Sequence, residues 1–127
     1  MPAAQAGVIA VIIDDIGYNY RAGLKSAALH PSITLSILPE TPFARKLANE
    51  LNSTNRELML HLPMQALLAK APKEPLVLTE SMHELEYKSQ VEDYLRKFPE
   101  VKGVNNHMGS LLTQKPKQMK WLMEVLS

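Results

Sequence analysis

Residues 7–17 read GVIAVIIDDIG, an apolar run that ends in two aspartates and a glycine. A continuous β-branched run is typical of a strand buried on both faces of a parallel sheet, so we predict a strand over residues 7–13. Asp14 and Asp15 then stand at its carboxyl end, although the whole chain has only three aspartates. Adjacent carboxylates at a buried strand end repel each other, and a bound cation relieves that repulsion.

The alternation of strand and helix continues outward from this segment. Four strand–helix units of this kind favour an α/β domain with a parallel sheet, either doubly wound or curling into a barrel. We find no internal repeat, low-complexity tract or linker, so residues 1–127 are predicted to form a single domain. The further strands are expected over 33–38, 57–62 and 101–105, and the helices over 20–29, 42–51, 82–98 and 117–126.

Three local signals refine the helices and one connection. Thr41 followed by Pro42 predicts a capped helix start, and Ser81 with Glu84 predicts a capping box for the helix that follows. Residues 70–75 contain proline and lysine and are expected to form a loop longer than a simple connector.

Composition excludes several classes of function. The net charge is +1 and the basic residues are scattered, so no electrostatic footprint indicates binding to nucleic acid or to an anionic membrane. The longest apolar runs fall far short of the ~20 residues that span a bilayer. The first residues lack the basic and apolar regions of a signal peptide. Because the chain has no cysteine, any metal site must use His, Asp or Glu.

Candidate metal ligands stand where three of the four strands end. Asp14 and Asp15 follow the first strand, His61 ends the third and His107 follows the fourth. The carboxyl ends of parallel strands meet at one edge of the sheet, where α/β proteins carry their chemistry. One carboxylate and two imidazoles form a common ligand set for Zn²⁺. Since side chains alternate along a strand, we expect the two aspartates to point in different directions, one to a metal and one to a water.

Each of these residues also has a simpler structural interpretation. An aspartate at this position can cap the next helix, and His61 can be a hydrogen-bonded core histidine. His107, beside a glycine and two asparagines, can stabilise a turn. His30 and His83 are expected to be surface residues without a functional role.

An apolar strand that ends in two aspartates also resembles a response-regulator receiver domain. Those domains hold Mg²⁺ with the paired acids, beside a phosphoacceptor aspartate at the end of the third strand. Here the third strand ends in His61, and no aspartate lies between Asp15 and Asp93. The missing acceptor disfavours this interpretation.

Three segments resemble the divergent branch of the polysaccharide deacetylase superfamily. They are IIDDIG at residues 12–17, ELMLHLPM at 57–64 and GVNNHMGS at 103–110. The third is the most specific, and the resemblance covers about residues 7–127. An Asp-Asp pair alone would be weak support, whereas the three segments in this order are specific.

The resemblance implies part of a distorted (β/α) barrel and a metal-dependent hydrolase that removes acetyl groups from a polysaccharide or oligosaccharide. It implies that Asp15, His61 and His107 hold a divalent metal, with Zn²⁺ expected. Asp14 would be the general base that takes a proton from a water whose pKa the metal lowers. The resemblance also implies a periplasmic or cell-envelope location.

Departures from the family pattern lead to further expectations. Gln65 and Ala66 stand where the branch commonly has glutamate and proline, so an acid near the site is missing. Barrels of this type need roughly 200 residues or more, so we expect the chain to be the N-terminal part of a longer barrel. The open edge of the fourth strand then predicts self-association. The alternative function is a catalytically inactive carbohydrate-associated or structural module with the same fold.

Overall fold

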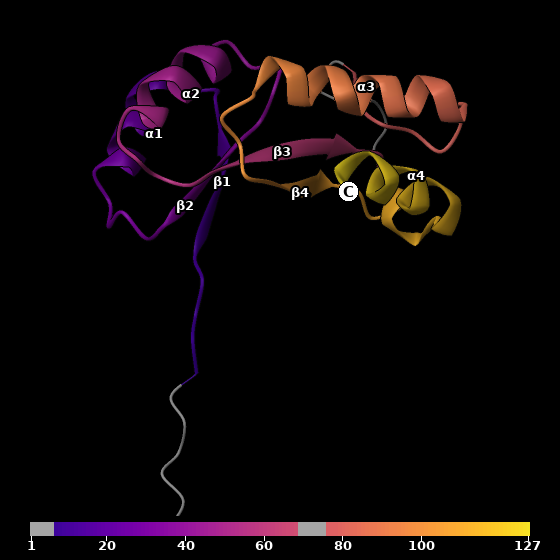
Figure 1. Ribbon diagram of the computed structural model, residues 1–127, viewed down its shortest axis with the longest axis horizontal. Coiled ribbons are helices and arrows are strands. Elements are labelled where there is room, and N and C mark those ends of the chain that lie inside the picture. The colour runs from indigo at the N-terminus through magenta and orange to yellow at the C-terminus, as the bar shows by residue number, and fades with distance from the viewer. Residues whose placement is uncertain (1–6, 69–75) are drawn as a thin grey trace, which may run out of the picture.

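Four parallel strands form the sheet of this protein, in the order β1-β2-β3-β4 (Figure 1). The computed structural model describes residues 7–68 and 76–127, so the expected loop over 70–75 lies outside the described residues. Strands and helices alternate as predicted. Their bounds are β1 Ile12–Ile16, α1 Tyr20–Ala27, β2 Thr34–Ile37, α2 Ala44–Asn52, β3 Leu58–Met64, α3 Glu84–Lys97, β4 Gly103–Met108, the 3₁₀ helix η1 Leu112–Gln114 and α4 Pro116–Leu126.

The strand order distinguishes between the two α/β arrangements that the sequence left open. Each strand pairs with the strand before it, whereas a doubly wound sheet reverses direction at a switch point. Right-handed crossovers that always advance in one direction place their helices on one face of the sheet. The sheet is also strongly twisted, since β1 crosses the direction of β3 in Figure 1. The α/β class is confirmed, and the arrangement is that of a partial barrel.

The pairing register gives the sheet one apolar and one polar face. Leu35 pairs with Leu58 and Ile37 with Leu60, and all four are buried in the core cluster together with side chains of α2, α3 and α4. The alternate positions face the other way. On β2, β3 and β4 this second face carries the polar side chains of Ser36, His61, Asn105 and His107.

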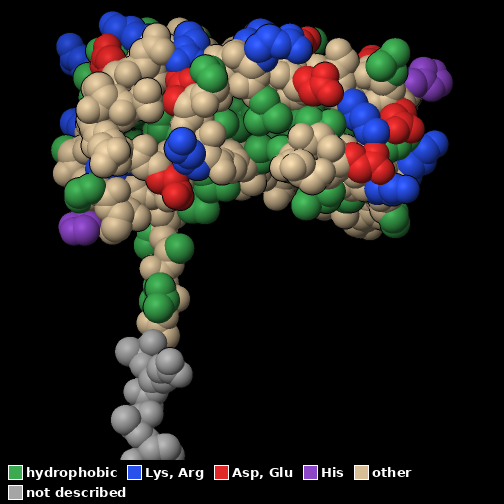
Figure 2. Space-filling view, viewed as in Figure 1, with side chains coloured by type: hydrophobic (Ala, Val, Ile, Leu, Met, Phe, Trp, Pro, Cys, Tyr) green, Lys and Arg blue, Asp and Glu red, His purple; other side chains and the backbone are tan. Residues whose placement is uncertain are grey.

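The apolar run over residues 7–13 does not form the predicted strand buried on both faces. β1 begins at Ile12, and Val8 is 99% exposed in a segment that projects from the domain (Figures 1 and 2). β1 lies at the edge of the sheet, and its only paired neighbour among the described strands is the four-residue β2. Because β2 pairs from Ile12 onward, residues 7–10 have no strand to pair with in the described part of the chain.

The predicted helix caps are also wrong. The Thr41 hydroxyl donates to the Leu38 carbonyl oxygen at 2.8 Å, and α2 begins only at Ala44. The Ser81 hydroxyl lies 3.0 Å from that of Thr79, and α3 begins after His83 without a side-chain cap. In both cases the helix begins two residues later than predicted, so Phe43 and His83 occupy the N-cap positions instead.

A buried arginine joins the connections at the amino ends of the strands. Arg56 is 7% exposed and precedes β3. Its guanidinium donates to four backbone carbonyl oxygens in the connection between α1 and β2, those of Ala27, Leu29, His30 and Ile33, at 2.6 to 3.0 Å. This group therefore ties the start of β3 to the segment that leads into β2.

Among the described residues, no helix combines the length and the hydropathy needed to cross a membrane.

Candidate metal centre

A register shift in β1 brings both aspartates to the same place. Ile13 pairs with Leu35 and Ile16 with Ile37, so a step of three residues in β1 matches a step of two in β2. The extra residue forms a bulge in which Asp15 has φ 59°. The regular alternation of side chains is broken there. Asp14 Oδ1 lies 3.8 Å from His61 Nδ1, and Asp15 Oδ1 lies 3.3 Å from His61 Nε2. The expectation that Asp14 and Asp15 point in different directions is therefore wrong.

The two histidines come from neighbouring strands on the polar face of the sheet. Pro63 pairs with His107, and His61 pairs with Asn105, so the two histidines are diagonal neighbours across β3 and β4. Their ring centroids are 4.9 Å apart in an edge-to-face arrangement. Both strands continue beyond the predicted ends, and each histidine lies inside its strand, which holds it more rigidly than a loop would.

Three side chains converge into a set of metal-ligand atoms. Asp15 Oδ1 lies 3.3 Å from His61 Nε2 and 3.1 Å from His107 Nδ1. One ligand atom from each of the three residues lies within 4.8 Å of the others. One carboxylate oxygen and two imidazole nitrogens fit Zn²⁺ or a similar ion. Since the Asp15 side chain is 62% exposed, the cluster is open to solvent on one side, where further ligands have access.

Asp14 lies beside these three ligand atoms rather than among them. Its Oδ1 is 3.8 Å from His61 Nδ1 and accepts a hydrogen bond from Asn105 Nδ2 at 2.8 Å. The two aspartates therefore occupy different positions around one imidazole, Asp15 on the Nε2 side and Asp14 on the Nδ1 side. This separation suits two different chemical roles.

Two residues of the site escaped the sequence analysis. Asn105 Oδ1 lies 2.9 Å from His61 Nδ1 and accepts a hydrogen bond from the Ser36 hydroxyl at 2.5 Å. Ser36 is fully buried, so strand β2, which seemed to offer nothing, supplies a polar group to the site. The available signal was a serine in the middle of a predicted strand whose only other polar residue is Thr34.

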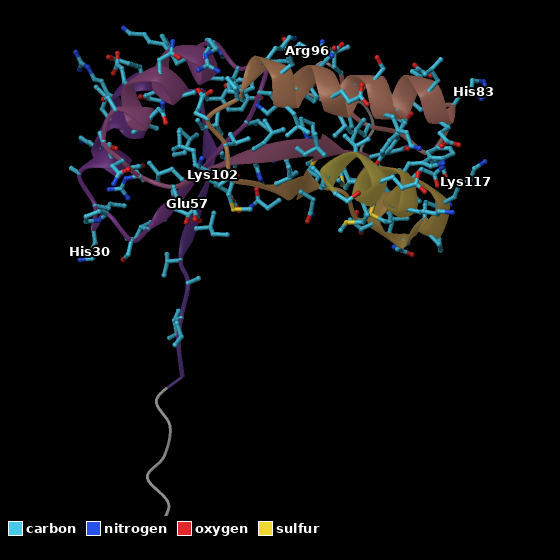
Figure 3. All side chains as sticks on the ribbon, in the orientation of Figure 1. His30, Glu57, His83, Arg96, Lys102 and Lys117 are labelled. Atoms are coloured by element: carbon cyan, nitrogen blue, oxygen red, sulfur yellow. The ribbon has the colours of Figure 1, made fainter. Side chains whose placement is uncertain are left out.

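The remaining candidates lie outside this cluster. His30 and His83 are exposed at opposite ends of the molecule, as expected (Figure 3). At the position where the family commonly has glutamate, Gln65 Oε1 accepts a hydrogen bond from the backbone of Glu80 at 2.9 Å. A glutamate at this position could accept the same hydrogen bond through a carboxylate oxygen. The glutamine therefore preserves this contact although it lacks the charge.

An apolar hollow adjoins the carboxyl ends of β3 and β4. Its volume is about 560 Å³, and Ala66, Leu67, Leu68, Met108 and Ser110 line it. A hydrogen bond of 3.0 Å from the Leu67 backbone to the Ser110 hydroxyl joins its two sides. Met108 directly follows His107, so the hollow lies at the same end of the sheet as the ligand cluster.

Comparison with known proteins gives one family and two curated relatives. A family model described as divergent polysaccharide deacetylase matches residues 11–127. The uncharacterized protein YibQ of Escherichia coli (strain K12) is 34% identical over 121 residues, which cover 95% of this chain and 38% of that protein. An uncharacterized protein of Haemophilus influenzae is 32% identical over 122 residues, covering 93% of this chain and 42% of that protein. The chain thus spans about two fifths of the length of these relatives.

A solved structure shares the fold. The crystal structure of an uncharacterized protein from Agrobacterium tumefaciens C58 superimposes with a TM-score of 0.82. It covers 91% of this chain and 48% of the other, with 15% sequence identity. At that identity the likeness supports the partial-barrel architecture alone.

Proposed function

The chain belongs to the divergent polysaccharide deacetylase family, and from this we propose that it carries the metal site of a hydrolase that removes acetyl groups from a polysaccharide or oligosaccharide. The observation that carries the proposal is the convergence of Asp15, His61 and His107, with Asp14 beside them. The family supports a carbohydrate substrate. We extend the proposal to a periplasmic or cell-envelope location.

Asp15, His61 and His107 would hold the metal, and we propose Zn²⁺. When bound, such an ion lowers the pKa of a water toward neutrality and polarises an acyl carbonyl. The donor set supports this choice because it is one oxygen and two nitrogens without sulfur. Burial of His61, 4% exposed, keeps one imidazole in a fixed orientation, while exposed Asp15 leaves room for water and substrate.

Asp14 is proposed as the general base. Its carboxylate accepts one hydrogen bond from Asn105, which orients it and leaves lone pairs on the carboxylate for a second proton donor. The base takes a proton from the attacking water as the new C–O bond forms at the acetyl carbon. The bond from that carbon to the sugar nitrogen or oxygen then breaks, the leaving group takes up the proton that Asp14 accepted, and acetate is released.

Calorimetric titration with Zn²⁺ tests the metal site. We expect one-to-one binding by the unmodified chain and no detectable binding by Asp15→Ala and His107→Ala. His30→Ala is the matched control, because His30 is exposed and lies between α1 and the start of β2, at the amino end of the sheet. Unchanged affinity in both cluster variants would contradict the proposed ligand set.

Acetate release from acetylated chito-oligomers tests the reaction. The assay uses this chain and the full-length Escherichia coli relative, each loaded with Zn²⁺. Asp14→Asn is expected to retain the metal and lose the activity, since the amide cannot take up the proton. If both proteins bind Zn²⁺ and bind the oligomer but release no acetate, the inactive carbohydrate-binding module becomes the better function.

A further inference from the structure

We propose that Asn105 is a positioning residue that keeps the proton of His61 on Nδ1 and thereby turns the lone pair of Nε2 toward Asp15 and His107. Asn105 also holds Asp14, so one amide would set the orientation of both the general base and a metal ligand. The catalytic meaning of this inference rests on the proposed function. The position of the His61 proton does not depend on that function, because it is inferred from hydrogen bonds alone.

The first step is the orientation of the Asn105 amide. The Asp14 carboxylate has no hydrogen to donate, so the Asn105 atom that lies 2.8 Å from it must be the donor, Nδ2. The amide oxygen Oδ1 then faces away from Asp14. A reversed amide would place two acceptors in contact, which excludes the alternative orientation.

The second step is the proton on His61. Asn105 Oδ1 has two lone pairs and accepts from the buried Ser36 hydroxyl at 2.5 Å, and it lies 2.9 Å from His61 Nδ1. Since this oxygen only accepts, Nδ1 must carry the hydrogen. In the neutral imidazole Nε2 is then the nitrogen that offers a lone pair, and it lies 3.3 Å from Asp15 Oδ1. A metal ligand needs that lone pair.

The contacts form one hydrogen-bonded path across all four strands. It runs from Ser36 on β2 and His61 on β3 to Asn105 on β4 and then to Asp14 on β1. His61 and Asn105 are partners in the sheet register, so the backbone itself holds the imidazole opposite the amide. Ser36 and His61 are buried, where an unsatisfied polar group is costly, and this burial strengthens the constraint.

The test locates the His61 proton in the metal-free chain by long-range ¹H–¹⁵N correlation spectra. The spectra are read for the neutral imidazole, in which one ring nitrogen carries the proton and the other does not. In the unmodified chain we expect Nδ1 to carry a proton, and in Asn105→Ala we expect this proton to be lost or shared with Nε2. Asn106→Ala is the matched control, since the Asn106 amide donates to the Met108 carbonyl oxygen instead.

Asn105→Asp separates the contact with His61 from the contact with Asp14. It also provides a test if Asn105→Ala does not fold. Its carboxylate can still accept from Nδ1 but cannot donate to Asp14, so we expect the Nδ1 proton to remain. The inference is overturned if Nδ1 lacks a proton in the unmodified chain or in Asn105→Asp. It is equally overturned if folded Asn105→Ala keeps the Nδ1 proton unchanged.

Zn²⁺ calorimetry on the same proteins separates this inference from the proposed function. If the function holds, Asn105→Ala should bind Zn²⁺ about 10- to 100-fold more weakly, the usual effect of removing a partner of a ligating histidine. If the Nδ1 proton behaves as expected but the unmodified chain binds no Zn²⁺, the positioning role of Asn105 stands and the proposed metal site fails.

Discussion

The amino and carboxyl ends of the strands carry charged groups in opposite environments, buried at one end and exposed at the other. At the amino end, the Arg56 cation is buried and surrounded by four carbonyl acceptors of fixed position. At the carboxyl end, Asp15 Oδ1 lies 3.3 Å from His61 Nε2, and the Asp15 side chain is largely exposed. One end has a permanent cation for its acceptors, and the other gathers a carboxylate and two imidazoles, to which we propose that a cation from solution binds.

This difference separates stability from function along the sheet. Barrels of this type usually carry stability at the amino ends of their strands and chemistry at the carboxyl ends. Variants at the amino end should therefore change the free energy of unfolding and leave metal affinity alone. Variants of the proposed metal ligands at the carboxyl end should do the reverse.

Asp15→Asn should have the largest effect, the complete loss of detectable Zn²⁺ binding. Asparagine tolerates the φ of 59° and keeps the side-chain shape, so the free energy of unfolding of the metal-free chain should change by less than about 1 kcal/mol. Calorimetry and urea unfolding measure the two quantities. The control is Asp93→Asn on α3, which should bind Zn²⁺ as the unmodified chain does. If Asp15→Asn also kept the Zn²⁺ affinity of the unmodified chain, the comparison between the two ends would fail.

Arg56→Met should come next, lowering the free energy of unfolding by about 3 kcal/mol. The substitution keeps an apolar stem but removes the guanidinium donor from part-buried backbone carbonyl oxygens such as those of Leu29 and Ile33. Urea unfolding measures the loss, with exposed Arg21→Met as the control. Zn²⁺ affinity of the folded variant should be unchanged, and a large decrease would show that the two ends are not independent.

Gly17→Ala tests whether the carboxyl end also contributes to stability. Gly17 has φ 145°, and a Cβ atom there would lie 1.9 Å from Thr41 Oγ1. Strain of this kind costs about 2 kcal/mol, which thermal or urea unfolding can detect. Gly7→Ala is the control, since a Cβ at Gly7 meets nothing within 4 Å. An unchanged unfolding midpoint would show that this turn adapts freely.

Tyr87→Phe provides a reference from the core between the two ends. The Tyr87 hydroxyl is buried and has no hydrogen-bond partner among the described residues, so its removal should stabilise the chain by about 1 kcal/mol at pH 7. Urea unfolding of both proteins at pH 7 measures this gain. Lower stability of the phenylalanine variant would show that the hydroxyl has a favourable partner.

The same substitution predicts a difference at alkaline pH. Burial raises the pKa of Tyr87 from 10.0 to about 12. The unfolded chain therefore loses this proton first, and the free energy of unfolding falls as pH rises from about 10 to about 12. Burial also raises the pKa of Tyr94. We expect Tyr87→Phe to lose less stability over this range than the unmodified chain, and equal slopes would contradict the expectation.

The sequence predicted the parts of the fold that depend on local pattern. The apolar runs, each followed by a helical segment, predicted the order of the four strands and helices. The same pattern placed Asp14, Asp15, His61 and His107 at one end of the sheet, where the structure brings them together.

The parts that were missed depend on residues far apart in the chain. The edge position of β1 follows from strand order, which local hydrophobicity does not contain. Ser36 and Asn105 meet across 69 residues, and Arg56 binds backbone carbonyls that leave no mark in the side-chain pattern. The predicted caps at Thr41 and Ser81 were wrong because each helix begins two residues later than the local pattern indicates.

The bulge in β1 has a consequence for how such a site can arise. A substitution changes which side chain stands at a position, but one inserted residue shifts every later side chain of the strand to the opposite face. Here that shift leaves two consecutive acids on the same side while Ile16 returns to the core. Inserting a single residue into an edge strand is therefore a route by which evolution or design can place two carboxylates on one face of that strand. The neighbouring strands need not change.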